Sequence, residues 1–456
     1  MAKTSSERIG ARSRSPGIRR AEQSNAAPKR NQAMKAQDSV KNFYPTLRMY
    51  TNFAVRTVKK TCAEFGPREA GSEAEYNAQK FMAEQVGDAA DATMEDSFRL
   101  SPRAFLGWLR LAGIFLLIAT ACNIVNLFFA KEIPYGPVAS LAFSGLIILI
   151  MLFEFLFYKE FTDPFYKKAT SHNVYCVRKP AGETKRRIIL AGHADSSIEW
   201  MPTRVGGAGF LYFTFAYGLL GLIYQIVVSV LVLAKPDLSP TVVSVLTYAG
   251  CAFVPGHFLL IFFMNYKVCV EGANDNLSGC MTAAAVMKFM GDNDLRFENT
   301  ELVVMFSGAE ESGLRGAKAA VKQHPEFTDK NVETVFVGLD TIKDYDEMAI
   351  YYKDMTGTVK QSPAACALVK AAGKECELDL KYAVLFAGAT DAAAMTQGGV
   401  PAVGFCAMNP GPPRYYHTRD DKVDIMEPKT IEKTLELALK TAYLFDEQGL
   451  KEAYDA

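Results

Sequence analysis

The sequence of 456 residues has no excess of charge, since 50 Lys and Arg balance 50 Asp and Glu. This balance excludes the strongly basic surface expected of a nucleic-acid-binding protein. The nine cysteines are odd in number and form no CxxC pair, so we expect reduced thiols and no disulfide framework. The first 40 residues are basic and polar and lack an apolar core, which argues against a cleavable signal peptide. We interpret residues 1–41 as a disordered basic tail, with contact to anionic lipid as a weaker hypothesis.

Two adjacent carboxylates, Glu310 and Glu311, stand at the end of an apolar stretch. Residues 301–307 predict a buried strand and residues 313–322 predict a helix, so the pair lies on a strand-to-helix turn. In open α/β sheets, ligands bind at such turns at the carboxyl ends of the strands. Neighbouring side chains on extended backbone point in opposite directions, so one glutamate can hold a metal while the other meets a water molecule. The alternative is a solvated turn in which both glutamates face water.

Histidine is scarce, with five residues in the chain, and two of these stand at similar positions. His193 and Asp195 end one predicted strand, and Asp340 ends another. Asp275 lies in a Gly/Asn turn before a helix of small residues, and His417 lies in a Pro-rich loop before the last helix. A single histidine is more often structural, but this set within one α/β frame favours a metal site. Imidazole and carboxylate ligands suit zinc.

The chemistry gives each of these residues a separate role. Asp275 is the natural bridge between two metal ions, which two-metal hydrolases hold about 3.5 to 4 Å apart. Asp195, two residues after His193, can accept a hydrogen bond from the ring nitrogen that binds no metal. Glu310 is then free to act as a general base, and Glu311 would be a ligand.

Five short motifs carry these residues. They are His193-Ala194-Asp195-Ser196, Gly272-Ala273-Asn274-Asp275-Asn276 with Ser278-Gly279, Glu310-Glu311-Ser312-Gly313, Leu339-Asp340 and Tyr416-His417-Thr418. Together they resemble the motifs of the co-catalytic zinc aminopeptidases of metallopeptidase clan MH, which includes bacterial leucyl aminopeptidases, glutaminyl cyclases and glutamate carboxypeptidases. The resemblance covers roughly residues 42–100 and 172–450. It implies an α/β fold of the zinc-peptidase (phosphorylase/hydrolase-like) type, with a mixed sheet sandwiched by helices.

The resemblance also implies a distribution of ligands. His193, Asp275 and Asp340 would serve one zinc ion. Asp275, Glu311 and His417 would serve the other, and Glu310 matches the general base of the family. Thr390-Asp391 looks like the polar pair that precedes the last strands of the family.

Residues 65–85 look like the first helix of the family. They contain a capping box, in which Ser72 caps the helix while Glu75 reaches back to the cap.

The chain departs from the family between His193 and Asp275, which lie 82 positions apart where the family has a short loop. Four long apolar runs occur in the chain: residues 111–130, 133–153, 205–234 and 238–266. Each is long enough to cross a bilayer, which takes about 20 apolar residues in a helix. Buried core helices are the alternative, but four runs of this length in one chain argue against it. We predict two transmembrane helical hairpins, residues 104–158 and 205–266, inserted into a discontinuous di-zinc peptidase domain of residues 42–100, 159–204 and 267–456.

The ligand positions constrain the topology. His193 and Asp275 must reach the same metal pair, so an even number of spans separates them. Lys and Arg near the span ends gather on the domain side, at residues Arg99, Arg103, Arg110, Lys159, Lys167, Lys168, Arg204 and Lys267. The two hairpin tips carry only Lys131 and Lys235. The positive-inside rule therefore predicts a multi-pass membrane protein with its catalytic domain in the cytoplasm.

The predicted function is that of a membrane-anchored aminopeptidase, which cleaves peptide substrates with two zinc ions and a glutamate base. Other divalent ions fit the same ligands. One alternative is a cyclase or deacylase with a single zinc ion, and another is a catalytically silent membrane scaffold. A relative with a dimerisation insert is disfavoured, because only 28 residues separate Glu311 from Asp340. The sequence predicts no substrate-binding residue and no oligomeric state.

Overall fold

The computed structural model describes residues 44–129, 135–386 and 388–454 of the chain. The predicted basic tail, residues 1–41, lies outside the described residues. Lys131, at the tip of the first predicted hairpin, lies outside them as well.

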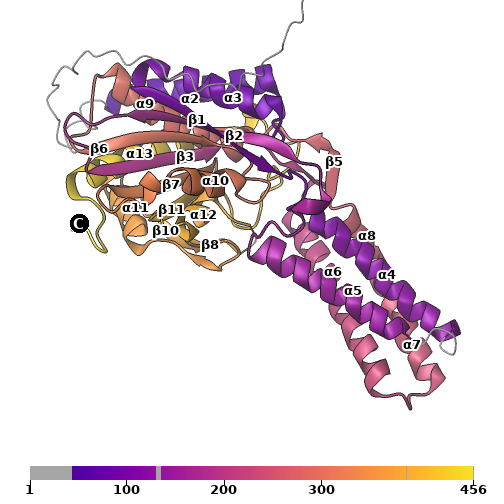
Figure 1. Ribbon diagram of the computed structural model, residues 1–456. Coiled ribbons are helices and arrows are strands. Elements are labelled where there is room, and N and C mark those ends of the chain that lie inside the picture. The colour runs from indigo at the N-terminus through magenta and orange to yellow at the C-terminus, as the bar shows by residue number, and fades with distance from the viewer. Residues whose placement is uncertain (1–43, 130–134, 387, 455–456) are drawn as a thin grey trace, which may run out of the picture. The chain divides into compact units, whose positions relative to one another are not determined.

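A mixed sheet of nine strands forms the centre of the described chain (Figure 1). The strands are β1 (Ala92–Leu100), β2 (Ala169–Arg178), β3 (Arg186–His193), β6 (Thr300–Ser307), β7 (Glu333–Ile342), β8 (Met348–Asp354), β9 (Val359–Lys360), β10 (Lys381–Val384) and β11 (Ala402–Ala407). Their order is β1-β2-β6-β3-β7-β11-β8-β10, and β9 pairs with β8. Strands β6, β3, β7 and β11 are parallel to one another. Antiparallel pairs flank them on both sides, and the expected mixed α/β sheet is confirmed.

Helices cover both faces of this sheet (Figure 1). They are α2 (Leu47–Phe65), α3 (Glu73–Glu84), α9 (Ser278–Asp292), α10 (Arg315–Gln323), α11 (Pro363–Glu375), α12 (Asp391–Gln397) and α13 (Pro428–Gln448). Ile188 and Leu190 of β3 pack into a core with α2, α3, α9, α11 and α13, whereas Ile189 and Ala191 pack into a second core with α10 and α12. Burial on both faces explains why the central strands read as continuous apolar runs.

Four helical segments are long and apolar enough to cross a membrane, judged by length and composition. They are α4 (Gly107–Phe129), α5 (Gly136–Ile150) with its continuation Met151–Leu156, α6 (Met201–Ala234), and the segment Pro240–Ile261, which contains α7 (Pro240–Gly250) and α8 (Val254–Ile261). They match the four apolar runs of the sequence, with differences at the ends. Helix α6 begins at Met201 and is kinked at Gly206 and Gly207. The last run ends as a helix at Ile261, because Met264 already starts strand β5.

A two-stranded ribbon closes the second hairpin at its base. Strand β4 (Ile198–Trp200) pairs antiparallel with β5 (Met264–Cys269), and Trp200 stands opposite Met264. The chain therefore leaves for α6 and returns from α8 at the same place. This pairing explains how His193 and Asp275 can lie close together although 82 positions separate them in the sequence.

Buried polar side chains join the apolar helices to one another. Asn123 of α4 donates to Gln225 Oε1 of α6 at 2.9 Å and to Ser140 Oγ of α5 at 3.0 Å. Gln225 in turn donates to Thr120 Oγ1 at 2.7 Å. Within an apolar environment such interhelical hydrogen bonds hold helices in register.

Candidate metal centre

The candidate ligands lie at one edge of the sheet. His193 is the last residue of β3, and Asp340 lies near the end of the neighbouring parallel strand β7. Glu310 and Glu311 follow β6, which borders β3 on the other side. Since the carboxyl ends of parallel strands meet at one edge, residues far apart in the sequence are brought together there.

Two groups of three side chains share Asp275. The first consists of His193, Asp275 and Asp340, and the second consists of Asp275, Glu311 and His417. In each group the possible ligand atoms lie within 4.8 Å of one another, so each group could hold a metal ion. The structure thus brings together all five residues that the sequence selected as ligands.

The two oxygens of Asp275 face different histidines. Oδ1 lies 3.1 Å from Nε2 of His193, and Oδ2 lies 3.1 Å from Nε2 of His417. The same nitrogen of His417 lies 3.1 Å from Oε1 of Glu311, and Nε2 of His193 lies 3.9 Å from Oδ1 of Asp340. A carboxylate between two such groups has the arrangement of a bridging ligand.

The electrostatics of the site favour an added positive charge. Burial raises the pKa of Asp340 to about 7 and that of Glu310 well above its usual range. Burial alone would lower the pKa of His417, but Glu311 and Asp275 outweigh it and raise that pKa to about 10. No Lys or Arg is among the described residues that line the cavity over these groups. A buried set of carboxylates and imidazoles without a Lys or Arg fits divalent metal ions.

Glu310 belongs to neither group. Its Oε2 lies 3.9 Å from Nε2 of His193, beside the ligands, and its side chain is buried. Adjacent Glu311 contributes to the second group, so the two neighbouring carboxylates have different surroundings.

Asp195 connects a candidate ligand to the glutamate turn. Asp195 contacts Nδ1 of His193 through its backbone oxygen at 3.2 Å, and its Oδ1 lies 3.4 Å from the same nitrogen. Its carboxylate also accepts the backbone N–H of Glu310 at 3.0 Å and that of Glu311 at 3.1 Å. No pattern in the sequence predicted these hydrogen bonds between Asp195 and the glutamate turn.

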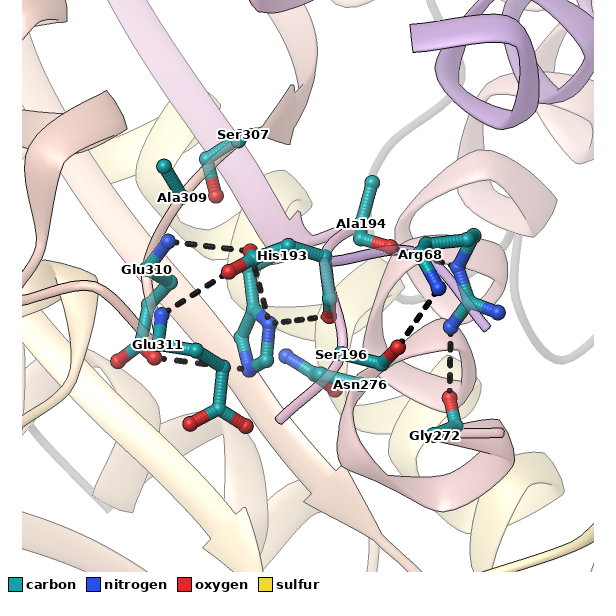
Figure 2. Close-up of polar contacts among 12 residues, drawn as sticks. Arg68, His193, Ala194, Ser196, Gly272, Asn276, Ser307, Ala309, Glu310 and Glu311 are labelled. Atoms are coloured by element: carbon teal, nitrogen blue, oxygen red, sulfur yellow. Dashed lines mark hydrogen bonds and ion pairs between the residues drawn. The ribbon is translucent and has the colours of Figure 1, made fainter. Parts of the chain in front are cut away.

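Arg68 is a positioning residue that the sequence did not reveal. It is fully buried and donates to the backbone carbonyls of Ala194 at 2.7 Å and Gly272 at 3.0 Å (Figure 2). Its backbone N–H donates to Ser196 Oγ at 2.9 Å. Arg68 therefore joins the loop after His193 to the loop that leads to the candidate bridge.

The side chain of Glu75 does not make the contact that the predicted capping box requires. Ser72 does cap α3, since its Oγ accepts the N–H of Glu75 at 3.2 Å. The carboxylate of Glu75, however, accepts from the N–H of Gly71 at 2.7 Å and of Ala309 at 2.8 Å, and from Ser171 Oγ at 2.9 Å. Burial raises the pKa of Glu75 to about 8. The side chain thus supports the turn just before Glu310 instead of reaching back to the cap.

Asp421 and Asp391 accept hydrogen bonds from residues next to the candidate ligands. Asp421 accepts the backbone N–H groups of Asn274 at 2.9 Å and Asp275 at 3.0 Å, and burial raises its pKa to about 7. Asp391, which the sequence paired with Thr390, accepts from Ser307 Oγ at 2.5 Å. Both carboxylates hold backbone or side chains of the strand-end loops in place.

Comparisons with known proteins agree with this geometry. The model of Peptidase family M28 matches residues 256–442, a range that contains four of the five candidate ligands and Glu310. None of the curated proteins matches the chain.

Solved structures show the same fold at low identity. The aminopeptidase from Aneurinibacillus sp. strain AM-1 superposes with a TM-score of 0.50 and 14% identity, covering 88% of this chain and 94% of that one. A zinc aminopeptidase from Bacillus subtilis gives 0.51 and 12%, covering 89% and 96%. A glutaminyl cyclase from an Acidobacteriales bacterium gives 0.51 and 13%, covering 93% and 100%. The fold is therefore M28-like, and it is shared by enzymes of two different activities.

Proposed function

We propose that this protein is a membrane-anchored aminopeptidase that uses two zinc ions. The observation that supports this best is Asp275, whose two oxygens each face a different histidine at 3.1 Å. One ion would be held by His193, Asp275 and Asp340, and the other by Asp275, Glu311 and His417. The family model and the two neighbouring aminopeptidases favour peptide-bond hydrolysis as the reaction.

The ions, when bound, would polarise the scissile carbonyl and lower the pKa of the attacking water. Glu310 would accept a proton from that water and deliver it to the departing amine, because its Oε2 lies 3.9 Å from Nε2 of His193 at the cavity and the side chain belongs to neither ligand group. Asp195 holds the glutamate turn through two backbone N–H groups. Arg68 holds the two loops that carry His193 and Asp275.

A single-zinc cyclase is the second candidate function. It is favoured by the glutaminyl cyclase from an Acidobacteriales bacterium, which shares the fold as well as the aminopeptidases do. The presence of two complete ligand groups favours two metal ions over one. A scaffold without chemistry has no physical reason to bury these ligands next to Glu310.

The helices α4 to α8 would anchor the protein in a bilayer as two hairpins. The excess of Lys and Arg on the domain side favours a cytoplasmic catalytic domain.

Metal analysis combined with a scan of peptides tests the proposal. We expect two zinc ions per chain and cleavage of peptides with a free amino terminus, at a rate that chelation abolishes. Peptides with a blocked amino terminus should resist cleavage. Equal cleavage of free and blocked peptides would contradict the aminopeptidase assignment, and one zinc ion with cyclisation of amino-terminal glutamine would favour the second candidate.

A further inference from the structure

A cavity lies over the candidate metal centre, and the ends of the membrane helices form its walls. Its volume is about 170 Å³. His193, Asp275 and Glu310 are among the residues at its polar end. Its apolar walls include Trp108 and Leu109 of α4, Phe155 after α5, Leu211 and Phe215 of α6, and Phe263 after α8. Both hairpins therefore border the site.

A row of aromatic rings runs from a candidate ligand to the second hairpin. The ring of His417 lies 4.4 Å from that of Trp200, measured between centroids, and Trp200 lies 5.1 Å from Phe263. Phe263 lies 5.3 Å from Phe215 of α6. The position of this helix is thus tied by direct packing to the metal centre.

The first hairpin reaches the other side of the site. Phe105, just before α4, packs against the glutamate turn, where a Cβ added to Gly313 would lie 3.0 Å from the ring. Phe155 connects Phe105, at 6.3 Å, to Trp108, at 5.6 Å. The walls are therefore continuous packed surfaces on both sides of the cavity.

The chemistry of the walls selects against acidic side chains. The described residues that line the cavity include no Lys or Arg, so an acidic side chain packed against the apolar walls would find no cationic side chain there. Tyr212 and Phe386, which also line the cavity, are 49% and 78% exposed and extend its apolar surface outward. Burying apolar area against such walls is favourable by about 25 cal/mol per Å².

We propose that the ends of the membrane helices form the specificity wall of this enzyme, and that its substrates are peptides with large apolar residues at the amino terminus. The inference rests on the proposed function for its chemistry. The apolar walls lie next to the candidate ligands, so a large apolar residue at the amino terminus of a peptide bound there would contact Leu211 and Phe215. Peptide segments released from a bilayer have this composition and would meet the cavity at the membrane helices.

The binding test uses intrinsic fluorescence, since the chain has two tryptophans and both line the cavity. Metal-depleted protein in phosphatidylcholine nanodiscs is titrated with Leu-Leu-bromophenylalanine amide and, separately, with Glu-Glu-bromophenylalanine amide. We expect saturable quenching by the apolar peptide at a concentration at least about tenfold below that of the acidic peptide. Equal quenching by both peptides would overturn the proposal.

Matched variants on one helix separate cavity binding from simple partition into lipid. Leu211→Ala and Phe215→Ala remove wall side chains of α6 and should each raise the half-quenching concentration about tenfold. Leu211→Val is the milder change and should give a smaller rise in the same direction. Leu220→Ala lies on the same helix, is 55% exposed and does not line the cavity, so it should leave the titration unchanged. If all four variants changed the half-quenching concentration equally, or if none changed it, the assignment of α6 to the specificity wall would be contradicted.

A turnover assay with zinc restored distinguishes a failure of this inference from a failure of the proposed function. We expect Leu211→Ala to lower kcat/KM for phenylalanyl peptides about tenfold and to leave alanyl peptides within about twofold. If no free-amine peptide is cleaved, the proposed function fails, while the quenching result still tests the cavity. If peptides are cleaved but charged amino termini are preferred, the inference alone fails. Tighter binding and faster hydrolysis of an N-acyl fatty amide would assign the cavity to lipid amides and overturn the peptide class.

Discussion

At the scale of single residues, two neighbouring glutamates differ in what surrounds them. Oε1 of Glu311 lies 3.1 Å from Nε2 of His417 within a ligand group, whereas Glu310 stands outside both groups. We expect Glu310→Gln to lower kcat by about 10² to 10⁴, because an amide cannot accept the proton of the attacking water. Metal content should stay at the wild-type value, measured by elemental analysis of the same preparation.

Glu311→Gln is the matched variant for this prediction. It should lower the affinity of one ion, so that metal content falls and added zinc restores part of the activity. Loss of metal from the Glu310 variant with full retention in the Glu311 variant would mean that the two roles are reversed. Full activity of both variants would favour the alternative interpretation, in which Glu310 and Glu311 lie on a solvated turn and have no role in the reaction.

Arg68 allows a prediction about positioning. Lysine keeps the charge but cannot reproduce the planar fork that reaches the carbonyls of Ala194, Glu271 and Gly272. Each buried carbonyl left without a donor costs about 1 to 3 kcal/mol. Arg68→Lys should therefore lower the Tm in detergent and reduce zinc affinity about 10- to 100-fold, measured by competition with a chelator. Arg48→Lys on α2, where Arg48 is exposed and paired with Glu432, serves as the control and should change neither value.

His324 gives stability a dependence on pH far from the metal centre. Burial alone would lower its pKa, but Asp96 at 2.6 Å and Glu326 at 2.7 Å outweigh burial and raise it. A raised pKa stabilises the fold fully below the unfolded value of about 6.5, and this stabilisation is lost as pH rises through the folded value. The Tm difference between wild type and His324→Gln should be largest near pH 6 and shrink toward pH 9. A difference that grows with pH would contradict a protonated His324.

The sequence revealed the candidate ligands and missed their supports for a physical reason. His193 and Asp340 stand at the ends of apolar strands, so a local pattern indicates where they lie. The carbonyls of Ala194 and Gly272, to which Arg68 donates, lie in loops more than 120 positions away, and no side-chain pattern encodes these contacts. Glu75 fitted a local capping motif, but its tertiary contact with Ala309 determined its orientation.

At the scale of elements, the base of the second hairpin shows that composition alone cannot decide whether a short apolar segment forms a helix or a strand. Residues 262–266 are nearly all apolar and looked like the end of a helix, yet Met264 begins β5. A short apolar segment is compatible with either a helix or a strand, so its composition alone does not decide between them. The pairing partner of Met264 is Trp200, which precedes the whole hairpin in the sequence. The central strands and the long helices were predictable because each has a sustained apolar pattern.

Arg315 joins the glutamate turn to the end of the first hairpin and to the segment after it. It begins α10 four residues after Glu311, is buried, and pairs with Asp163 at 2.7 Å, with Glu160 at 2.8 Å and with Glu154 at 3.7 Å. Removing one partner of a buried ion pair typically costs about 3 to 5 kcal/mol, because the other charge stays buried. Arg315→Leu should therefore lower the Tm strongly and reduce turnover, since the glutamate turn loses its link to the hairpin.

A double variant provides the control for Arg315. Arg315→Leu combined with Asp163→Asn removes the arginine and the nearest of its carboxylate partners, while Glu154 and Glu160 remain, and should recover part of the lost stability, measured by thermal unfolding in the same detergent. A Tm of Arg315→Leu within about 1 °C of wild type would show that the ion pair does not tie the hairpin to the domain.

At the scale of the whole molecule, the shared site fixes how the chain can cross a bilayer. His193 and His417 flank Asp275, and the ribbon of β4 and β5 returns the chain to its starting point after the second hairpin. If these helices cross a bilayer, each hairpin must begin and end on the side of the candidate metal centre. The number of crossings between any two strands of the sheet would then be even.

This constraint predicts the result of a topology experiment. Reporters inserted at Gly182, in the loop before β3, and fused after Ala456 should lie in the same compartment, and a reporter at Asp237, in the tip of the second hairpin, should lie in the opposite one. Fusions to green fluorescent protein and to alkaline phosphatase measure this, since each is active on one side only. Opposite compartments for Gly182 and Ala456 would contradict the shared site itself.

The direction of insertion is a separate prediction from charge. Arg204 and Lys267 flank the second hairpin on the domain side, and Lys235 is the basic residue of its tip. Because basic residues near span ends stay in the cytoplasm, we expect fluorescence at Gly182 and phosphatase activity at Asp237. Arg204→Glu with Lys267→Glu, combined with added lysines at the tip, should increase the inverted fraction. A wild-type protein with phosphatase activity at Gly182 would place the metal centre outside the cytoplasm, while the even number of crossings would still hold.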